Sequence, residues 1–291
     1  MFSSDQILGL VSFSIPLCLH LIGLTLLVFT RFDEEERTQR LYYITLSTGE
    51  VAVSLFYIMK MVLREYYSIL FYPLWLAQYC LGYCLMYETM IFLTLDRFFS
   101  IFLNIKYPLF WTYSKTIKLV IGAWIFNLLM LVAFWLNRVS LTVLNTYLYV
   151  IFDILFLVTS IGTYTYIIAM IRKKQKVCNL ELTNNTTRQQ TNTNTTEGSR
   201  PPKGRKSRTN TKQFISVFLL VITFTTFTVL PNFIYFGFGL SSKQMDPWMV
   251  SVLMAMYSIS LICDFLIYTL SSKNIRKTLK KIFRYKISSR M

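Results

Sequence analysis

The sequence predicts an all-α membrane protein, a bundle of seven transmembrane helices followed by a short amphipathic C-terminal helix. Three observations lead to this prediction. The 291 residues are 54% hydrophobic and only 15% charged, whereas an average soluble domain has about 25% charged residues. Seven apolar stretches are each long enough to cross a bilayer as a helix, which takes about 20 residues. The basic residues gather in alternate connecting segments and give a formal net charge of +16.

The seven apolar stretches are predicted to be helices because a backbone in lipid must satisfy its own hydrogen bonds. Strands of a membrane barrel would alternate apolar and polar residues over about ten positions, and these stretches do not. The first stretch has no basic segment before it and is longer than the core of a signal peptide, so we expect it to be retained. The predicted spans are residues 7–30, 41–63, 74–103, 117–136, 146–171, 214–240 and 247–270.

The distribution of Lys and Arg predicts the orientation of the bundle. Of the 30 basic residues, only Lys60, Arg64, Arg138 and Lys243 fall on the side of the membrane that holds the N-terminus. Because basic residues accumulate on the cytoplasmic side, we expect a multi-pass plasma-membrane protein with its N-terminus outside and its C-terminus in the cytosol. The excess positive charge then faces anionic membrane lipids, and we do not expect a nucleic-acid partner.

Ionisable side chains inside the spans are candidates for function, because each costs about 2.5–3.5 kcal/mol at the centre of a membrane helix. Glu50 lies in the second span, Glu88 in the third, Asp153 in the fifth and Asp264 in the seventh. Each of these acids must face the interior of the bundle or water, because lipid offers no hydrogen-bond partner.

The third span has one helical face that joins tyrosines at one end to an arginine at the other. Its members recur at steps of four and three residues, and they are Tyr79, Tyr83, Met86, Met90, Leu93 and Arg97. Two interpretations of Arg97 stay open. It either caps the span as an ion pair with Asp96 at the membrane surface, or it is held by Asp96 until a partner engages it.

The segment 173–213 is predicted to be a disordered cytoplasmic loop. It has no aromatic residue and is rich in Asn and Thr, then in Lys and Arg, so it buries too little surface to offset the entropy of ordering. The glycosylation sequons at Asn184, Asn185 and Asn194 would lie in the cytosol and stay unused.

Several motifs in these spans resemble, in type and order, those of rhodopsin-like (class A) G-protein-coupled receptors. The matching segments are LSTGE at 46–50, LTLDRF at 93–98, YPL at 107–109, Trp124, Pro231 and CDFLIY at 263–268. The basic segment that follows resembles the short helix these receptors place along the membrane, and we expect it over 271–285. Its apolar stripe would consist of Ile275, Leu279, Ile282 and Phe283.

This resemblance implies a receptor that transduces an extracellular ligand to a heterotrimeric G protein. The sixth span would swing at Pro231, where a backbone hydrogen bond is missing, and would uncover Arg97 and Tyr268. The implied coupling and switch residues are Asp96, Arg97, Phe98, Pro231 and Tyr268. Glu50 and Asp264 would meet in the middle of the bundle, where two carboxyl groups share a proton or hold an allosteric sodium ion. No other cofactor is implied.

The candidate ligand pocket follows from the faces of the spans, although ordinary interhelical packing accounts for the same residues equally well. Its members are Tyr79, Tyr83, Asp153, Asn232, Tyr235, Met254 and Tyr257. Amine receptors of the family carry an Asp on the third span, where this chain has Tyr79, and opsins need a Lys in the seventh span, which this chain lacks. The resemblance therefore favours neither a biogenic amine nor retinal as the ligand.

Departures from the family pattern keep other functions open. Phe265 stands where the seventh-span motif has Pro, Val229 stands where the sixth span usually has its Trp, and neither outer segment has the usual Cys. A non-signalling relative of the receptors is therefore one alternative, and an ion- or proton-coupled transporter is another. We expect neither a catalytic residue nor a metal site, because His20 is the single His of the chain.

Overall fold

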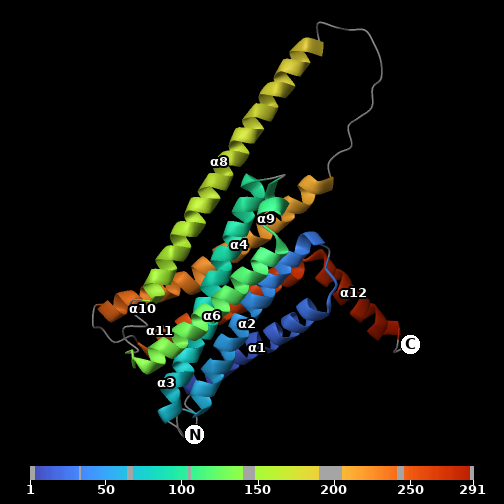
Figure 1. The fold of residues 1–291 in the computed structure, drawn as a ribbon. Helices are drawn as coiled ribbons and strands as arrows, with labels where there is room; N and C mark the ends of the chain where they lie inside the picture. The colour runs from blue at the N-terminus through green and yellow to red at the C-terminus, as the bar shows by residue number, and fades with distance from the viewer. Residues whose placement is uncertain are drawn as a thin grey trace.

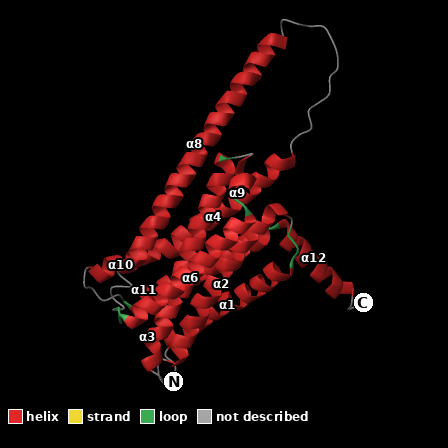
Figure 2. Ribbon diagram, in the orientation of Figure 1, coloured by secondary structure: helices red, strands yellow, loops and turns green. Residues whose placement is uncertain are grey.

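The computed structural model describes residues 4–32, 34–63, 68–103, 106–139, 148–189, 205–240 and 246–288, which are almost entirely helical (Figures 1 and 2). Within this part, six helices are long and apolar enough to cross a membrane, so the chain is a multi-pass, all-helical membrane protein. They are α1 (Ser4–Phe29), α2 (Glu34–Leu63), α6 (Tyr113–Leu136), α8 (Tyr149–Gln189), the rod made by α9 (Arg205–Phe224), η4 (Thr225–Val229) and α10 (Leu230–Leu240), and α11 (Pro247–Ser271).

The predicted third span is a helical rod with an irregular middle. It consists of α3 (Ser68–Ala77), the π-helical segment η1 (Gln78–Cys84) and α4 (Leu85–Phe102). The predicted span over 74–103 is helical, and within it the segment η1 is wound as a π-helix. Because α4 also contains Glu88, Asp96 and Arg97, this rod is not among the six spans that length and composition identify.

Neighbouring helices alternate in direction, as short connections require. Near the start of α1, the ring of Phe13 stacks on Tyr57 of α2 at 4.0 Å between ring centroids. Near the other end of α1, Arg40 of α2 donates to the carbonyl of Leu27 at 2.8 Å. α1 and α2 are therefore antiparallel.

The two ends of the described chain lie at opposite ends of the bundle. In Figure 1, α1 starts beside α3, whereas α12 (Lys273–Ser288) leaves the bundle from the opposite end. There the Thr30 hydroxyl donates to the Thr278 hydroxyl of α12 at 3.3 Å. We call these the Ser4 end and the Arg97 end. The predicted C-terminal helix is confirmed as a helix, with Ile275 buried against the bundle and Leu279 partly buried; Ile282 and Phe283 lie outside the described side chains.

The outer surface of the bundle is apolar. Leu129 of α6 and Val158 and Ile161 of α8 are about two-thirds exposed, and similar residues cover the outside of the other spans. A surface of this kind would aggregate in water and fits a hydrocarbon environment.

The structure differs from the prediction of disorder over 173–213. α8 continues to Gln189, far beyond the bundle (Figure 1), and α9 already starts at Arg205. Extending a helix that is already nucleated costs little for residues such as Lys, Gln, Glu and Leu, which are frequent just after the predicted end of the span. Residues 190–204, including Asn194, lie outside the described part.

The sixth rod has a second π-helical segment, directly before Pro231. Pro231 has no N–H to donate to the preceding turn, and η4 widens that turn over Thr225–Val229. The predicted irregularity at this proline is therefore present in the backbone.

We predict that the contact between η1 and α2 limits the stability of the fold. A Cβ on Gly82 would lie 2.5 Å from Val53 Cγ2 and 3.1 Å from the Val53 backbone nitrogen, whereas one on Gly122 of α6 would meet nothing within 4 Å. Gly82→Ala should lower the free energy of unfolding by about 1–3 kcal/mol, as overpacking does. Gly122→Ala should leave it unchanged or raise it by up to about 1 kcal/mol. Unfolding of the purified protein in mixed micelles checks this, and equal effects of the two substitutions would contradict it.

Candidate functional site

Three clusters of buried polar side chains lie along the axis of the apolar bundle. Polar groups there must find partners inside the protein, because lipid offers none. Toward the Arg97 end lies the Arg97 cluster, composed of Asp96, Arg97 and Tyr107. The His20 cluster, in the middle, is composed of His20, Ser47, Glu50, Asp264 and Tyr268. Toward the Ser4 end lies the Asp153 cluster, composed of Tyr87, Asp153, Asn232 and Tyr257.

The His20 cluster joins α1, α2 and α11 through one imidazole ring. His20 Nδ1 lies 2.7 Å from Glu50 Oε2 and 3.2 Å from each of the hydroxyls of Ser47 and Tyr268. His20 Nε2 lies 2.8 Å from the carbonyl oxygen of Leu261. His20, Glu50 and Asp264 are all inaccessible to solvent, so every contact is made in a dry interior.

The partners of the imidazole fix where its protons are. A carbonyl oxygen only accepts, so Nε2 carries a hydrogen and donates it to Leu261. A neutral ring then has no hydrogen on Nδ1. The short Nδ1–Glu50 contact therefore requires one proton, which sits either on the Glu50 carboxyl or on a charged His20. In both forms the pair is electrically neutral.

Asp264 adds a second carboxyl group to this pair, as the sequence predicted. Its Oδ1 accepts a hydrogen bond from the Thr223 hydroxyl at 3.2 Å, and its carboxyl group is close enough to Glu50 for a hydrogen bond. Within the described part, Asp264 Oδ2 and Glu50 Oε1 receive no other donor. A second proton, held between the two carboxyl groups, satisfies both oxygens and makes the whole cluster neutral.

A sodium ion fits this arrangement less well than a proton does. Sodium takes several oxygen ligands, yet one oxygen of Glu50 is already occupied by His20 Nδ1. Within the described residues, no group of three or more His, Cys, Asp and Glu side chains is arranged to hold a metal ion. The proton shared by His20 and Glu50 makes this pair neutral without a cation.

In the Arg97 cluster, the arginine side chain is buried inside the bundle. Arg97 Nε donates to Asp96 Oδ2 at 3.0 Å, and Nη2 donates to the same oxygen. The other carboxylate oxygen accepts from the Tyr107 hydroxyl at 2.5 Å. Burial and the nearby Asp96 carboxylate raise the pKa of Tyr107, so this hydroxyl keeps its proton and remains a donor. Arg97 is only 6% exposed, so a partner reaches it only after neighbouring helices move.

Tyr268 links the His20 cluster to the Arg97 end. Its hydroxyl lies 3.1 Å from the Ser47 hydroxyl, and its ring stacks on Tyr43 at 5.6 Å between ring centroids. Tyr43 in turn is an electrostatic neighbour of Arg97. Phe98, which the resemblance grouped with these residues, lies elsewhere. Its ring stacks on Phe102 and contacts Tyr166 of α8.

The Asp153 cluster brings together three of the predicted pocket residues, Asp153, Asn232 and Tyr257. The hydroxyl of Tyr87 donates to Asp153 Oδ1, and Tyr257 donates to Asn232 Oδ1. Asn232 Nδ2 donates to the Tyr87 hydroxyl at 2.8 Å and to Asp153 Oδ1 at 3.3 Å. One network therefore connects α4, α8, α10 and α11.

The other predicted pocket residues are less closely grouped. Tyr79 and Tyr83 both contact Tyr149 of α8 edge to face, at 4.8 and 5.4 Å between ring centroids. Met254 is partly buried against the core. Tyr235 is 51% exposed and forms no part of the Asp153 network.

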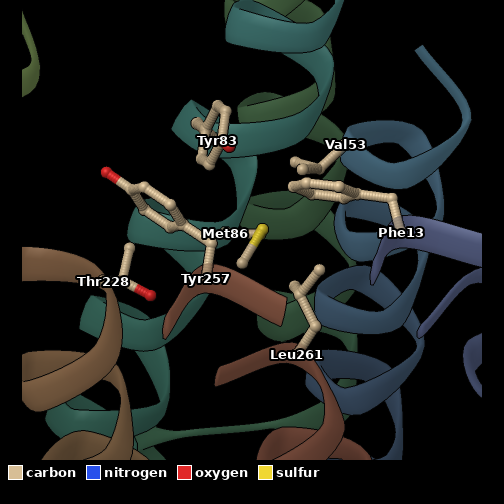
Figure 3. A pocket seen from close by; sticks show the side chains of 7 residues that line it. All are labelled: Phe13, Val53, Tyr83, Met86, Thr228, Tyr257 and Leu261. Atoms are coloured by element: carbon tan, nitrogen blue, oxygen red, sulfur yellow. The ribbon is translucent and has the colours of Figure 1, made fainter. Parts of the chain in front are cut away.

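A small pocket lies next to the His20 cluster, and Tyr83 and Tyr257 are among the residues that line it. Figure 3 shows the side chains that line it converging from several helices, and they are Phe13, Val53, Tyr83, Met86, Thr228, Tyr257 and Leu261. The pocket has no space for a water molecule. In this conformation the bundle is closed here, and a ligand would have to separate Tyr83 from Tyr257.

Sequence reasoning singled out neither His20 nor Tyr87 of these clusters, and it also missed Tyr149, which precedes Asp153 on α8. His20 was excluded as the only His, although an ionisable residue in the middle of an apolar span is itself a signal. Tyr87 follows Tyr83 by four residues and so lies near the same face. Tyr149 precedes Asp153 by four residues in the same way.

Comparison with models of known protein families gives no match, and comparison with curated protein sequences gives none either.

We predict that Glu50 depends on His20 for its neutralisation. His20→Leu should lower the free energy of unfolding by about 3–5 kcal/mol, because it leaves a buried acid without its partner. The double variant with Glu50→Gln should recover most of that loss, since glutamine has no charge to compensate. Unfolding of the three proteins in mixed micelles checks this. If the double variant is no more stable than His20→Leu alone, the two residues are not coupled in the way described.

Proposed function

We propose that the chain is a divergent receptor of the rhodopsin-like, G-protein-coupled type, which crosses the plasma membrane seven times. In this proposal the rod α3–η1–α4 is the third of seven crossings. Support comes from its place in the bundle, since residues of this rod contact α2, α6, α8 and the sixth rod. The start of α1 and the helix α12 lie at opposite ends of the bundle, which also suits an odd number of crossings (Figure 1).

The observation that carries the proposal is the buried Asp96–Arg97 pair with Tyr107 bound to the same carboxylate. The pair lies at the end of the bundle where basic residues predict the cytosol. A charged guanidinium that only capped a helix would extend to the surface, whereas Arg97 is enclosed. This geometry favours a guanidinium that becomes accessible only when helices move to admit a partner. In this proposal the partner is the heterotrimeric G protein.

The proposed mechanism is a shift between closed and open forms of one bundle. A ligand entering from the Ser4 end would have to bind the open form more tightly than the closed one, because only a difference in affinity moves the equilibrium. Separation of Tyr83 from Tyr257 would open the pocket of Figure 3. Movement of the sixth rod at Pro231 would then expose Arg97 and Tyr268 to the G protein.

Two other functions have specific support. The three ionisable residues of the His20 cluster, buried in the middle of a membrane protein, favour a proton-coupled transporter. Phe265 and Val229, which replace family residues, favour a receptor relative that no longer signals. Proton flux into liposomes that contain the purified protein would support the transporter. Absence of nucleotide exchange on every G-protein subtype, together with absence of proton flux, would support the non-signalling receptor relative.

We predict that Arg97 is required for coupling. Arg97→Gln should abolish nucleotide exchange on G proteins in membranes, measured with and without tissue extract as a ligand source, while the amount of protein at the cell surface stays the same. Lys115→Gln is the matched control, because Lys115 is an exposed base at the same end whose ammonium group donates to the Phe110 carbonyl and lies over the Phe110 ring. Exchange that survives in Arg97→Gln would refute the role of this residue.

We also predict that Asp96 holds the receptor inactive. Asp96→Asn removes the charge that pairs with Arg97 and weakens the bond from Tyr107, so exchange without ligand should rise several-fold. The same membranes and G proteins serve for this measurement.

Tags placed at the two termini and detected in intact cells show on which side of the membrane each terminus lies. Both tags on one side of the membrane would exclude seven crossings and the receptor proposal with them.

A further inference from the structure

In the Asp153 cluster, both donors to the carboxyl group go to the same oxygen. Tyr87 and Asn232 both donate to Asp153 Oδ1, and Tyr257 orients Asn232 by donating to its carbonyl oxygen. Every bond in the chain has its hydrogen pointing toward the acid. Two donors from other helices on one carboxylate oxygen stabilise the ionised form.

The other oxygen of Asp153 has no partner. Asp153 is fully buried, and its Oδ2 has no hydrogen bond within the described part. No Lys, Arg or His of the described residues forms a salt bridge with it. Protonation does not remove the difficulty, because a hydrogen on Oδ2 would then be a buried donor without an acceptor. An ionised carboxyl with one bare oxygen is suited to a positively charged donor from outside the chain.

Aromatic rings lie near Asp153, and the hydroxyl of Tyr79 is an electrostatic neighbour of its carboxyl group. Tyr149 lies one helical turn before Asp153 on α8 and contacts Tyr79 and Tyr83 edge to face. Tyr83 also contacts Tyr257, at 6.2 Å between ring centroids. Tyrosine faces attract cations, and the attraction is larger where water is excluded. Among the described residues the buried hydroxyl of Tyr79 has no hydrogen-bond partner, which leaves an acceptor for a second hydrogen of the same ligand.

We propose that Asp153 binds the cationic group of the ligand, a primary ammonium or a guanidinium. Oδ2 accepts the hydrogen bond of the cation, and the rings of Tyr79, Tyr83 and Tyr149 enclose it. This inference rests on the proposed receptor function and names the chemical class of its ligand. The site differs from that of the biogenic-amine receptors, because the acid belongs to α8 and the third-span position is Tyr79.

The network also explains how such a ligand would act on the bundle. A cation on Oδ2 draws the carboxyl group away from Tyr87 and Asn232, and Asn232 is bonded to Tyr257. Tyr257 and Tyr83 close the pocket of Figure 3. Binding at Asp153 therefore loosens the contact that must open.

The test uses two cations and a neutral analogue of the same shape. Benzylammonium, benzylguanidinium and benzyl alcohol are each added to the purified, full-length protein in detergent, up to about 10 mM, and the unfolding temperature is measured. Binding to the folded form raises that temperature, by about 2–4 °C once the site is nearly filled. We expect this rise with at least one cation and no rise with benzyl alcohol.

The variants assign the effect to Asp153. Asp153→Asn should lose the rise, whereas Glu88→Gln should keep it, because Glu88 is an acid at the α4–α6 contact that pairs with Asn127. A rise that persists in Asp153→Asn, an equal rise with benzyl alcohol, or no rise with either cation overturns the inference. If Asp153→Asn does not fold, Tyr79→Phe takes its place. It removes the proposed second acceptor, so the rise with the cation should become smaller, and an unchanged rise overturns the inference. No G protein is present, so a failure here leaves the exchange experiment on Arg97 unaffected, and the reverse also holds.

Discussion

The constraint on which the structure depends is that a bilayer interior supplies neither hydrogen-bond partners nor countercharges. The apolar exterior of the bundle meets this constraint without cost, but the ionisable residues meet it only by pairing inside. Asp96 pairs with Arg97, Glu50 with His20, and Glu88 with Asn127. Asp96 and Arg97 are neighbours on α4, and Asp96 also binds Tyr107 of α5 (Tyr107–Phe110). The other two pairs join different helices, so satisfying these polar groups also fixes how the helices pack.

The His20 cluster shows how one histidine within a span changes the way in which two buried carboxyl groups can be neutralised. Two carboxyl groups alone at the middle of a membrane protein call for a metal ion or for protons. With an imidazole at 2.7 Å from one of them, a proton shared by His20 and Glu50 already makes that pair neutral. The hydroxyl of Tyr268 contacts both the imidazole and the Ser47 hydroxyl, so the direction of its hydrogen bonds depends on where this proton lies.

Part of this arrangement could be predicted from the sequence, because charge and periodicity are local properties. The apolar stretches, the meeting of Glu50 with Asp264, and the Asp96–Arg97 pair all follow from which residues share a face or a depth. The rotation of each helix about its own axis does not follow, and it decides that Tyr257 reaches Asn232 while Tyr235 is half exposed. The π-helical turns at η1 and η4 shift that rotation by a fraction of a turn. No residue pattern in this chain predicted the turn at η1.

The sixth rod and α11 are held together at three levels, and each level belongs to a different part of the proposed mechanism. Tyr257 donates to Asn232 at the Asp153 cluster, Thr228 donates to Ser260 at 2.9 Å beside the closed pocket, and Thr223 donates to Asp264 at the His20 cluster. The first two bonds lie on either side of Pro231, where the backbone already lacks one hydrogen bond. A displacement that begins at Asn232 therefore reaches η4 before it reaches Thr223. The two buried acids are therefore both bonded to the sixth rod, Asp153 through Asn232 after Pro231 and Asp264 through Thr223 before it. In the proposed mechanism, a movement of this rod would change the surroundings of both acids.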